Sequence, residues 1–236
     1  MTAAALARAT VKAEPMQDTA PIRDAATTIL VRDAGTDPRV LMGQRGTRAA
    51  FMPSKFVFPG GAVDPGDAEV ALAGPLAPGC ATRLADGPLS PQALAAAAIR
   101  ELWEETGLML AAPGRWPAPP PEAWAGFAAR GMLPAAQHLN YVFRAITPPG
   151  RPRRFAARFY LARAEALAGD PDDFRHAQPE LANLQWIPLD AAPRLDLPFI
   201  TEVVLAELAA RLRDGGADGV PFFDNSGTRS EFRRIP

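Results

Sequence analysis

One helix, expected over residues 91–106, constrains the fold more than any other part of this sequence. Ser90 is a favourable N-cap, because its hydroxyl accepts a hydrogen bond from a backbone N–H that the first helical turn leaves free. Pro91 suits the first helical position, where no backbone N–H is needed, and an alanine run follows it. Gly107 is the residue type that most easily adopts the left-handed conformation at a helix end. The sequence therefore predicts both ends of this helix.

Three glutamates lie on one side of the predicted helix. Glu101, Glu104 and Glu105 stand at positions i, i+3 and i+4, which share a face at 3.6 residues per turn. Like charges at this spacing repel by roughly 0.2–0.5 kcal/mol per pair on an exposed helix, so a positive partner is expected, either Arg100 or a divalent cation. Without such a partner the glutamates would form a solvated acidic face. The opposite, buried face is expected to contain Ala95, Ile99, Leu102 and Thr106 or Ala98.

Composition excludes several classes of protein. The 25 Lys+Arg against 26 Asp+Glu give a net charge of -1, without the basic excess of a dedicated nucleic-acid binder. The single cysteine, Cys80, excludes an intramolecular disulfide and a multi-cysteine metal site. The two histidines, His138 and His176, are far apart and do not favour a zinc centre. Any metal ligands are therefore oxygens, which suits Mg²⁺ or Mn²⁺.

The location of the protein is expected to be cytoplasmic. No apolar run approaches the roughly 18 residues that a membrane span needs. The first 23 residues lack the apolar stretch of a secretory signal, and we expect residues 1–23 to form a flexible tail. These observations predict a soluble protein that contacts no membrane.

Strand and helix patterns suggest one α/β domain over residues 24–214. Strands are predicted over 25–32, 39–44, 56–58, 141–146, 155–164 and 184–189. The first two are expected to form a hairpin, and the fourth and fifth an antiparallel pair. Further helices are expected over 121–130, with Trp124 and Phe127 inward, and over 201–213. Loop-like insertions are expected at about 68–90 and 111–140, and a coil over 215–236.

The residues around the glutamates resemble the signature of the Nudix hydrolase family. That signature is G, five residues, E, seven residues and then R-E-U-x-E-E-x-G-U, where U is aliphatic. Residues 100–108, RELWEETGL, match its second half completely. Its first half is represented by Gly61 and by Asp67, where the family usually has glutamate. Between Asp67 and Arg100 lie 32 residues (68–99) instead of seven, so the role of Asp67 stays open.

The resemblance extends beyond the signature. The segments KFVFPGG, RVLMGQRG and ELANLQWIPLD are similar to strands that flank it in the family. The inserted signature loop is most similar to that of the peroxisomal coenzyme A diphosphatase subgroup and its bacterial relatives. The chain ends in RIP and not in an SKL-type address, so a peroxisomal location is not expected.

The resemblance implies a fold, a reaction and a set of site residues. The fold is a mixed β-sheet sandwiched between helices (α/β/α), and the reaction is the metal-dependent hydrolysis of a diphosphate linkage in a nucleoside-diphosphate derivative. The metal ligands implied are Glu101, Glu104 and Glu105, completed by the carbonyl of Gly60 or Gly61. Arg100 would hold a glutamate in place. The general base stays open between Glu101, Glu180 and another carboxylate such as Asp172 or Asp173.

The substrate is less constrained. Coenzyme A or its acyl thioesters are favoured, with a dinucleotide or a nucleoside-diphosphate sugar as the alternative. A nucleotide-binding domain without catalysis is a third hypothesis, which the intact glutamates disfavour. Arg45 matches the first arginine of a coenzyme A motif, whereas Ala50 and Ser54 stand where that motif has Arg and Gly. The candidate phosphate-binding residues are Arg45, Arg48, Lys55 and Arg154, with Arg153 and Arg158 as further arginines, and Phe51, Trp124 or Tyr160 as adenine-stacking rings. The resemblance is compatible with either a monomer or a homodimer.

Overall fold

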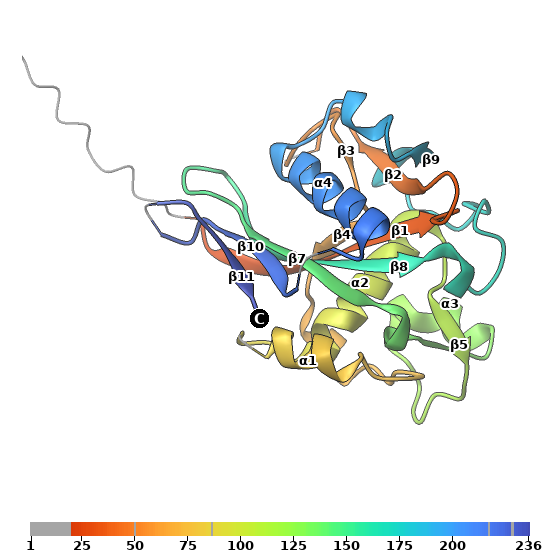
Figure 1. Ribbon diagram of the computed structural model, residues 1–236. Coiled ribbons are helices and arrows are strands. Elements are labelled where there is room, and N and C mark those ends of the chain that lie inside the picture. Colours follow the sequence, from red (N-terminus) through yellow and green to blue (C-terminus); the bar gives the residue numbers. More distant parts are fainter. Residues whose placement is uncertain (1–19, 50, 86, 217, 228) are drawn as a thin grey trace, which may run out of the picture.

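The fold is organised around a nine-stranded mixed sheet, seen edge-on between two layers of helices in Figure 1. The computed structural model describes residues 20–49, 51–85, 87–216, 218–227 and 229–236. The strands of the sheet are β1 (Ile22–Arg32), β2 (Arg39–Arg45), β3 (Phe56–Val57), β4 (Gly60–Ala62), β7 (Asn140–Ile146), β8 (Arg154–Arg163), β9 (Leu181–Pro188), β10 (Val220–Asp224) and β11 (Glu231–Ile235). Their order is β11-β10-β7-β8-β1-β2-β3, with β4 paired to β1 and β9 paired to β2.

The helices and short elements complete the fold. The α-helices are α1 (Pro78–Leu84), α2 (Pro91–Thr106), α3 (Ala125–Ala129) and α4 (Phe199–Asp214). A separate two-stranded sheet contains β5 (Ala111–Pro113) and β6 (Met132–Pro134). The 3-10 turns are η1 (Pro65–Glu69), η2 (Glu122–Trp124), η3 (Ala136–His138), η4 (Ala164–Ala166) and η5 (Ala192–Arg194). No helix among the described residues has the length and apolar character needed to cross a membrane.

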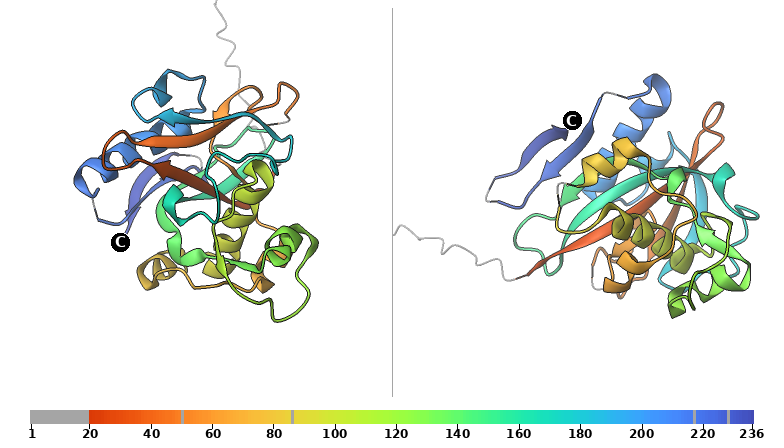
Figure 2. Two further views of the ribbon diagram at one scale, coloured as in Figure 1. Left: turned by 90° about the vertical axis from the view of Figure 1, so that its right-hand side faces the viewer. Right: turned by 90° about the horizontal axis from the view of Figure 1, so that it is seen from below.

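Strand β1 divides the core into two layers. Successive side chains of a strand point to opposite faces of the sheet. On one face, Ala26 and Leu30 pack in the cluster that contains α2. Ile29 and Val31 pack in the other cluster, together with the α4 residues Val204, Leu205 and Leu208. The two helices therefore cover opposite faces of the sheet, as the views in Figure 2 also show. The predicted α/β/α arrangement is confirmed.

Helix α2 has the two ends that the sequence predicts. The Ser90 hydroxyl accepts a hydrogen bond from the Ala93 N–H at 3.1 Å. Gly107 has a φ of 74° and donates its N–H to the Trp103 carbonyl at 2.7 Å. The buried face is wider than expected, since every residue from 93 to 99 is buried. Small alanine side chains allow this close packing on several sides of the helix.

The predicted insertions contain regular structure. Helix α1 lies in the first and places Cys80 and Leu84 in the core, so this segment is not simply a loop. The second contains β5, η2, α3, β6 and η3, with Trp124 and Phe127 buried as predicted.

The two predicted tails need correction. Residues 215–236 are not coil, because β10 pairs with β7 in parallel and β11 pairs with β10. Val220, Phe222 and Ile235 from this segment are buried. Strand β10 (VPFFD) contains a proline and β11 (EFRRI) is mostly charged, so neither five-residue strand has an alternating apolar pattern, and both depend on pairing with a distant strand. At the other end, β1 already begins at Ile22, and residues 1–19 of the predicted flexible tail lie outside the described residues.

Candidate active site

The glutamate-bearing half of α2 meets β4, whose first two residues are Gly60 and Gly61. The Gly60 N–H donates to Glu105 Oε2 at 2.7 Å, and Glu105 is only 2% exposed. Gly61 lies directly against Glu101, since a Cβ atom on Gly61 would come within 2.5 Å of that carboxylate. Only glycine can approach the carboxylate so closely. The structure thus brings together the two halves of the signature.

Arg100 is the centre of the site's ion-pair network. Its Nε and Nη2 donate to the two oxygens of Asp67 at 3.0 and 2.9 Å. Its Nη1 donates to Glu101 Oε1 at 2.9 Å and to Glu104 Oε2 at 3.2 Å. Nη2 also donates to the Ala62 carbonyl at 2.9 Å. The guanidinium therefore holds two of the three helix glutamates and ties them to the segment that follows β4.

Asp67 is a site residue whose role the sequence left open. Its carboxylate is 2% exposed and also accepts the N–H of Asp64 at 2.8 Å, at the start of η1. The long segment between Asp67 and Arg100 folds away as α1 and its loops, so the two residues still meet. Five residues separate Gly61 from Asp67, as in the first half of the signature, and this spacing was the sequence signal for a role of Asp67 in the site.

Burial of several carboxylates together changes their protonation. Burial is the main cause that raises the pKa of Glu101 to about 7, against the opposing effect of Arg100. The pKa of Glu105 is raised well above its usual value by burial, and the pKa of Glu104 is raised for the same reason. The neighbouring Arg100 therefore does not offset the desolvation of these groups.

Glu180 reaches the same site from another part of the chain. It directly precedes β9, whose pairing with β2 places Leu181 opposite Arg45. Arg45 Nη2 donates to Glu180 Oε1 at 2.8 Å. The charge of Glu180 raises the pKa of both Glu101 and Glu105, so its carboxylate lies within electrostatic range of the helix glutamates.

The other candidate bases are engaged elsewhere. Asp172 accepts hydrogen bonds from Arg32 at 2.8 and 3.1 Å. Asp173 accepts hydrogen bonds from Arg175, which lowers its pKa. This leaves Glu101 and Glu180 as the candidate bases, and the charge of Glu180 is one of the causes that raise the pKa of Glu101.

A cationic pocket of about 520 Å³ adjoins Glu180, and we call it the arginine pocket. Of the predicted phosphate-binding residues, Arg45 and Arg48 line it, and Arg153 joins them from the turn before β8. Arg48 and Arg153 make no ion pair with any residue that the structure describes. The remaining lining residues are Gly46, Thr47, Ala49, Phe51 and Glu180.

One wall of the arginine pocket is the loop that contains Phe51, and this loop packs against the start of β8. The ring of Phe51 packs edge-on against Phe155, with centroids 5.3 Å apart. Ser54 has a φ of 62°, a left-handed conformation that favours glycine, and it stands where the coenzyme A motif has glycine. Ala50, the other departure, lies outside the described residues.

The structure places several predicted ligand-binding residues outside the arginine pocket. Arg154 is buried, and it donates to the carbonyls of Thr147 and Asn225 at 3.0 and 2.9 Å, which makes it a structural residue. Lys55 does not line the arginine pocket and pairs with Asp196. The proposed stacking rings Trp124 and Tyr160 are buried in the core, and Arg158 is buried beside Asp24.

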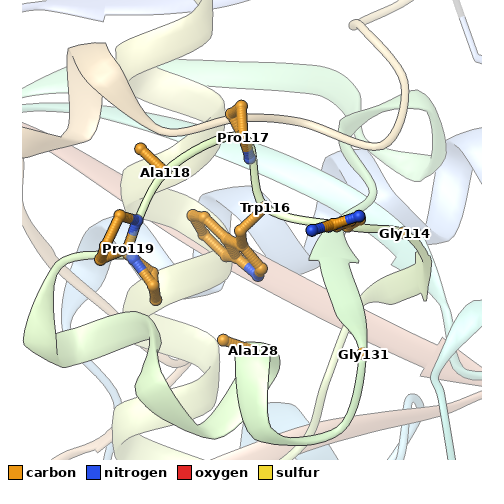
Figure 3. A pocket seen from close by; sticks show the side chains of 9 residues that line it. Gly114, Trp116, Pro117, Ala118, Pro119, Ala128 and Gly131 are labelled. Atoms are coloured by element: carbon orange, nitrogen blue, oxygen red, sulfur yellow. The ribbon is translucent and has the colours of Figure 1, made fainter.

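A second pocket, of about 580 Å³, lies in the proline-rich connector (Figure 3). Its wall is formed around Trp116, with Pro117, Ala118 and Pro119 on one side and Ala128 on the other. Arg115 is its only charged lining residue. This pocket lacks the carboxylates that metal-dependent chemistry needs, and its greater volume does not make it the better candidate.

The carboxylates of Glu101, Glu104 and Glu105 suit a hard divalent cation, provided that their side chains and that of Arg100 rearrange locally. Among the described residues, no three His, Cys, Asp or Glu side chains already converge in a metal-binding group. Arg100 contacts both Glu101 and Glu104, and so fills the position of a cation between them. Glu105 Oε1, however, is buried and has no hydrogen-bond partner among the residues that the structure describes. All-oxygen donors and an unsatisfied buried oxygen fit Mg²⁺ or Mn²⁺.

Comparison with known proteins gives this site a context. No model of a protein family matches the chain. A Caenorhabditis elegans protein named as a nudix hydrolase is 32% identical over 176 residues, which cover 70% of this chain and 51% of that protein. The chain thus spans about half the length of that curated relative. The crystal structure of a Nudix hydrolase from Alicyclobacillus acidocaldarius has a TM-score of 0.64 and 30% identity, covering 84% of this chain and 95% of the other. With this likeness extending over nearly the whole of a solved Nudix hydrolase, the chain belongs to the Nudix hydrolase family.

Proposed function

We propose that this protein hydrolyses the diphosphate linkage of a nucleoside-diphosphate derivative, with Mg²⁺ or Mn²⁺ as its cofactor. One observation carries the proposal: Glu105 is buried against Gly60, Glu101 is partly buried against Gly61, and desolvation raises the pKa of both. Carboxylates buried with too little positive charge are stabilised in their ionised form by a divalent ion. Family membership supports the same reading.

In the proposed mechanism, Glu101, Glu104 and Glu105 would hold the cation, and the carbonyl of Gly60 or Gly61 would complete the set. The bound cation supplies neutralisation of diphosphate oxygens and a lowered pKa for the attacking water. Arg100, which donates to Glu101 and Glu104 in this structure, would have to give up part of these contacts for the two carboxylates to serve as metal ligands. Its two bonds to Asp67 keep the guanidinium in place and so position the glutamates.

Glu180 is proposed as the general base. Its side chain is 56% exposed, so water can reach it, while the Arg45 bond fixes one of its oxygens. The other oxygen is free to accept the proton of the attacking water. Glu101 is the alternative, but its contacts with Arg100 and Gly61 favour a role in holding the cation.

The arginine pocket supports a substrate with negative charge beyond the scissile diphosphate. Within the described part of the chain, the guanidinium groups of Arg48 and Arg153 have no ion-pair partner, and arginine donors match phosphate oxygens well. Coenzyme A and its acyl thioesters carry such a further phosphate on their adenosine. A dinucleotide or a nucleotide sugar without this group would leave the two arginines without an anionic partner.

A substrate panel tests the proposal. Coenzyme A, an acyl thioester, a dinucleotide and ADP-ribose would be incubated with the protein, with and without Mg²⁺. We expect Mg²⁺-dependent hydrolysis, a preference for coenzyme A, and a loss of at least about 100-fold in kcat for Glu104→Gln. Glu122→Gln, an exposed glutamate outside the site, is the matched control and should keep full activity.

The outcomes separate the hypotheses. Turnover of ADP-ribose but not of coenzyme A would reject the coenzyme A assignment and keep the reaction class. Binding of these compounds without turnover would support a nucleotide-binding domain and reject the hydrolase. Full activity of Glu104→Gln would show that the helix glutamates do not hold the cation.

A further inference from the structure

Strand β11 leaves one edge of the large sheet open. It is the terminal strand in the sheet order, and among the described residues it pairs only with β10. The right-hand view of Figure 2 shows the β10–β11 hairpin on the outside of the molecule. Four of its five residues are exposed, from Glu231 to Arg234. An open edge presents unpaired N–H and C=O groups, and is a template for another strand.

An aromatic cluster accompanies this edge. It consists of Phe199, Phe223 and Phe232, and we call it the aromatic patch. Phe199 and Phe232 are 66% and 60% exposed, more than any other large apolar side chain in the described part of the chain. Their rings lie 6.1 and 6.3 Å from that of Phe223, so the three form a continuous surface. A cluster of exposed rings next to an open strand marks an interaction surface.

The charges along β11 are arranged for pairing with a second copy of itself. Two identical antiparallel strands related by a two-fold axis must place one residue opposite its own copy. A centre at Glu231, Arg233 or Arg234 sets like charges opposite one another. A centre at Phe232 sets the two phenylalanines opposite each other, and each Glu231 opposite the partner's Arg233. Among the registers centred on a residue of β11, this one alone has opposite charges on both sides of its centre.

The hairpin itself leaves Glu231 in need of a cation. Within the hairpin Glu231 is opposite Asp224, which is a like-charge pair. Glu231 makes no ion pair with the residues described, whereas Arg233 lies 3.9 Å from Asp224 and packs over the ring of Phe222. The partner's Arg233 would stand on the open side of Glu231 and offset this repulsion.

We propose that two copies of this chain associate through their β11 strands, antiparallel and centred on Phe232. Phe223 is opposite Phe232 in the hairpin, so the dimer contains a row of four phenylalanines across the two-fold axis. Phe199 of α4 widens the interface beyond the strand. The sheet then continues from one subunit into the next, and the open edges are paired.

The experiment measures the molar mass of the full chain by analytical ultracentrifugation across a concentration series. The unmodified protein is expected to dimerise. E231R and R233E each place like charges opposite one another twice in the interface, so each should raise the dimer dissociation constant at least about 100-fold. When the two variants are mixed, every facing pair becomes Arg opposite Glu, and a heterodimer should form. E165R, an exposed reversal outside the edge, should leave the mass unchanged.

Several results would overturn the proposal. A protein that stays monomeric at its highest soluble concentration is one, and a dimer that both reversals leave intact is another. If the monomer's β11 amides resist hydrogen exchange, a segment of the same chain covers the edge instead of a second copy. Circular dichroism of each variant distinguishes a lost interface from a lost fold, and the mixed heterodimer decides the matter even where one variant is less stable.

Discussion

Asp67 and Arg100 form a two-point ion pair, Oδ1 to Nε at 3.0 Å and Oδ2 to Nη2 at 2.9 Å, although 33 positions separate them in the chain. Both side chains are almost fully buried. The pair joins the segment after β4 to the helix that carries the glutamates, and Arg100 in turn contacts Glu101 and Glu104. The inserted segment can therefore be long without altering the site, because its two ends are tied together at this pair.

Loss of this pair should destabilise the protein. Asp67→Asn leaves the buried guanidinium of Arg100 without its main partner, and breaking a buried ion pair costs about 3–5 kcal/mol. We expect a loss of this order in the free energy of unfolding, measured with urea. Asp214→Asn removes an exposed partner of Arg213 and should change stability by less than about 0.5 kcal/mol. Equal effects of the two variants would contradict a structural role for the Asp67 pair.

Gly61 should be required for the position of Glu101. In Gly61→Ala the new Cβ would come within 2.5 Å of the Glu101 carboxylate and push it away. We expect a folded protein with a weakened affinity for Mg²⁺ and reduced kcat. Gly66→Ala is the matched control, because no atom lies within 4 Å of a Cβ at that position. If Gly61→Ala binds Mg²⁺ normally in a calorimetric titration, the contact between Gly61 and Glu101 does not matter for the cation.

The stability of the metal-free protein should fall as the pH rises. Burial raises the pKa of Glu101 from 4.5 to about 7, so the folded state binds more protons than the unfolded chain over this interval. The free energy of unfolding then decreases with increasing pH, and the thermal midpoint should be lower at pH 8 than at pH 5.

Magnesium and one substitution provide the controls for this pH dependence. Saturating Mg²⁺ should flatten the profile, because a bound cation favours the ionised carboxylates. Glu101→Gln should remove the part of the slope that this group contributes. A metal-free protein that becomes more stable between pH 5 and pH 8 would contradict the burial of an uncompensated Glu101.

The free arginines of the arginine pocket should act on substrate binding. Arg48→Ala and Arg153→Ala each remove a charged hydrogen-bond donor, and we expect the KM for coenzyme A to rise about tenfold with little change in kcat. Arg163→Ala, an exposed arginine outside the pocket, should leave both constants unchanged. An unchanged KM in both pocket variants would show that the anionic part of the substrate binds elsewhere.

Replacement of the proposed base should affect the chemical step. We expect Glu180→Gln to lower kcat by about 10²–10⁴-fold while the affinity for Mg²⁺ is retained. Glu165→Gln replaces another exposed glutamate and should have no effect. Should Glu180→Gln keep its kcat while Glu101→Gln loses it at saturating Mg²⁺, Glu101 would be the base instead.

The sequence determined the elements whose signals are local. Both ends of α2 follow from Ser90, Pro91 and Gly107, and the shared face of Glu101 and Glu104 follows from helical spacing. The hairpin of β1 and β2 and the antiparallel β7–β8 pair were also predicted correctly. In each case the deciding interaction lies within a few residues along the chain, or across a short turn.

Tertiary structure alone decided which distant residues meet. Arg153, in the turn before β8, lines the arginine pocket, whereas its neighbour Arg154, the first residue of β8, is buried against the carbonyls of Thr147 and Asn225. Glu180 joins the site because β9 pairs with β2, and Asp67 because its loop folds back onto α2. Strands β10 and β11 exist because β7 offers an edge. These contacts depend on non-local pairing, whose free energy comes from the assembled sheet and core and leaves no periodic trace in the sequence.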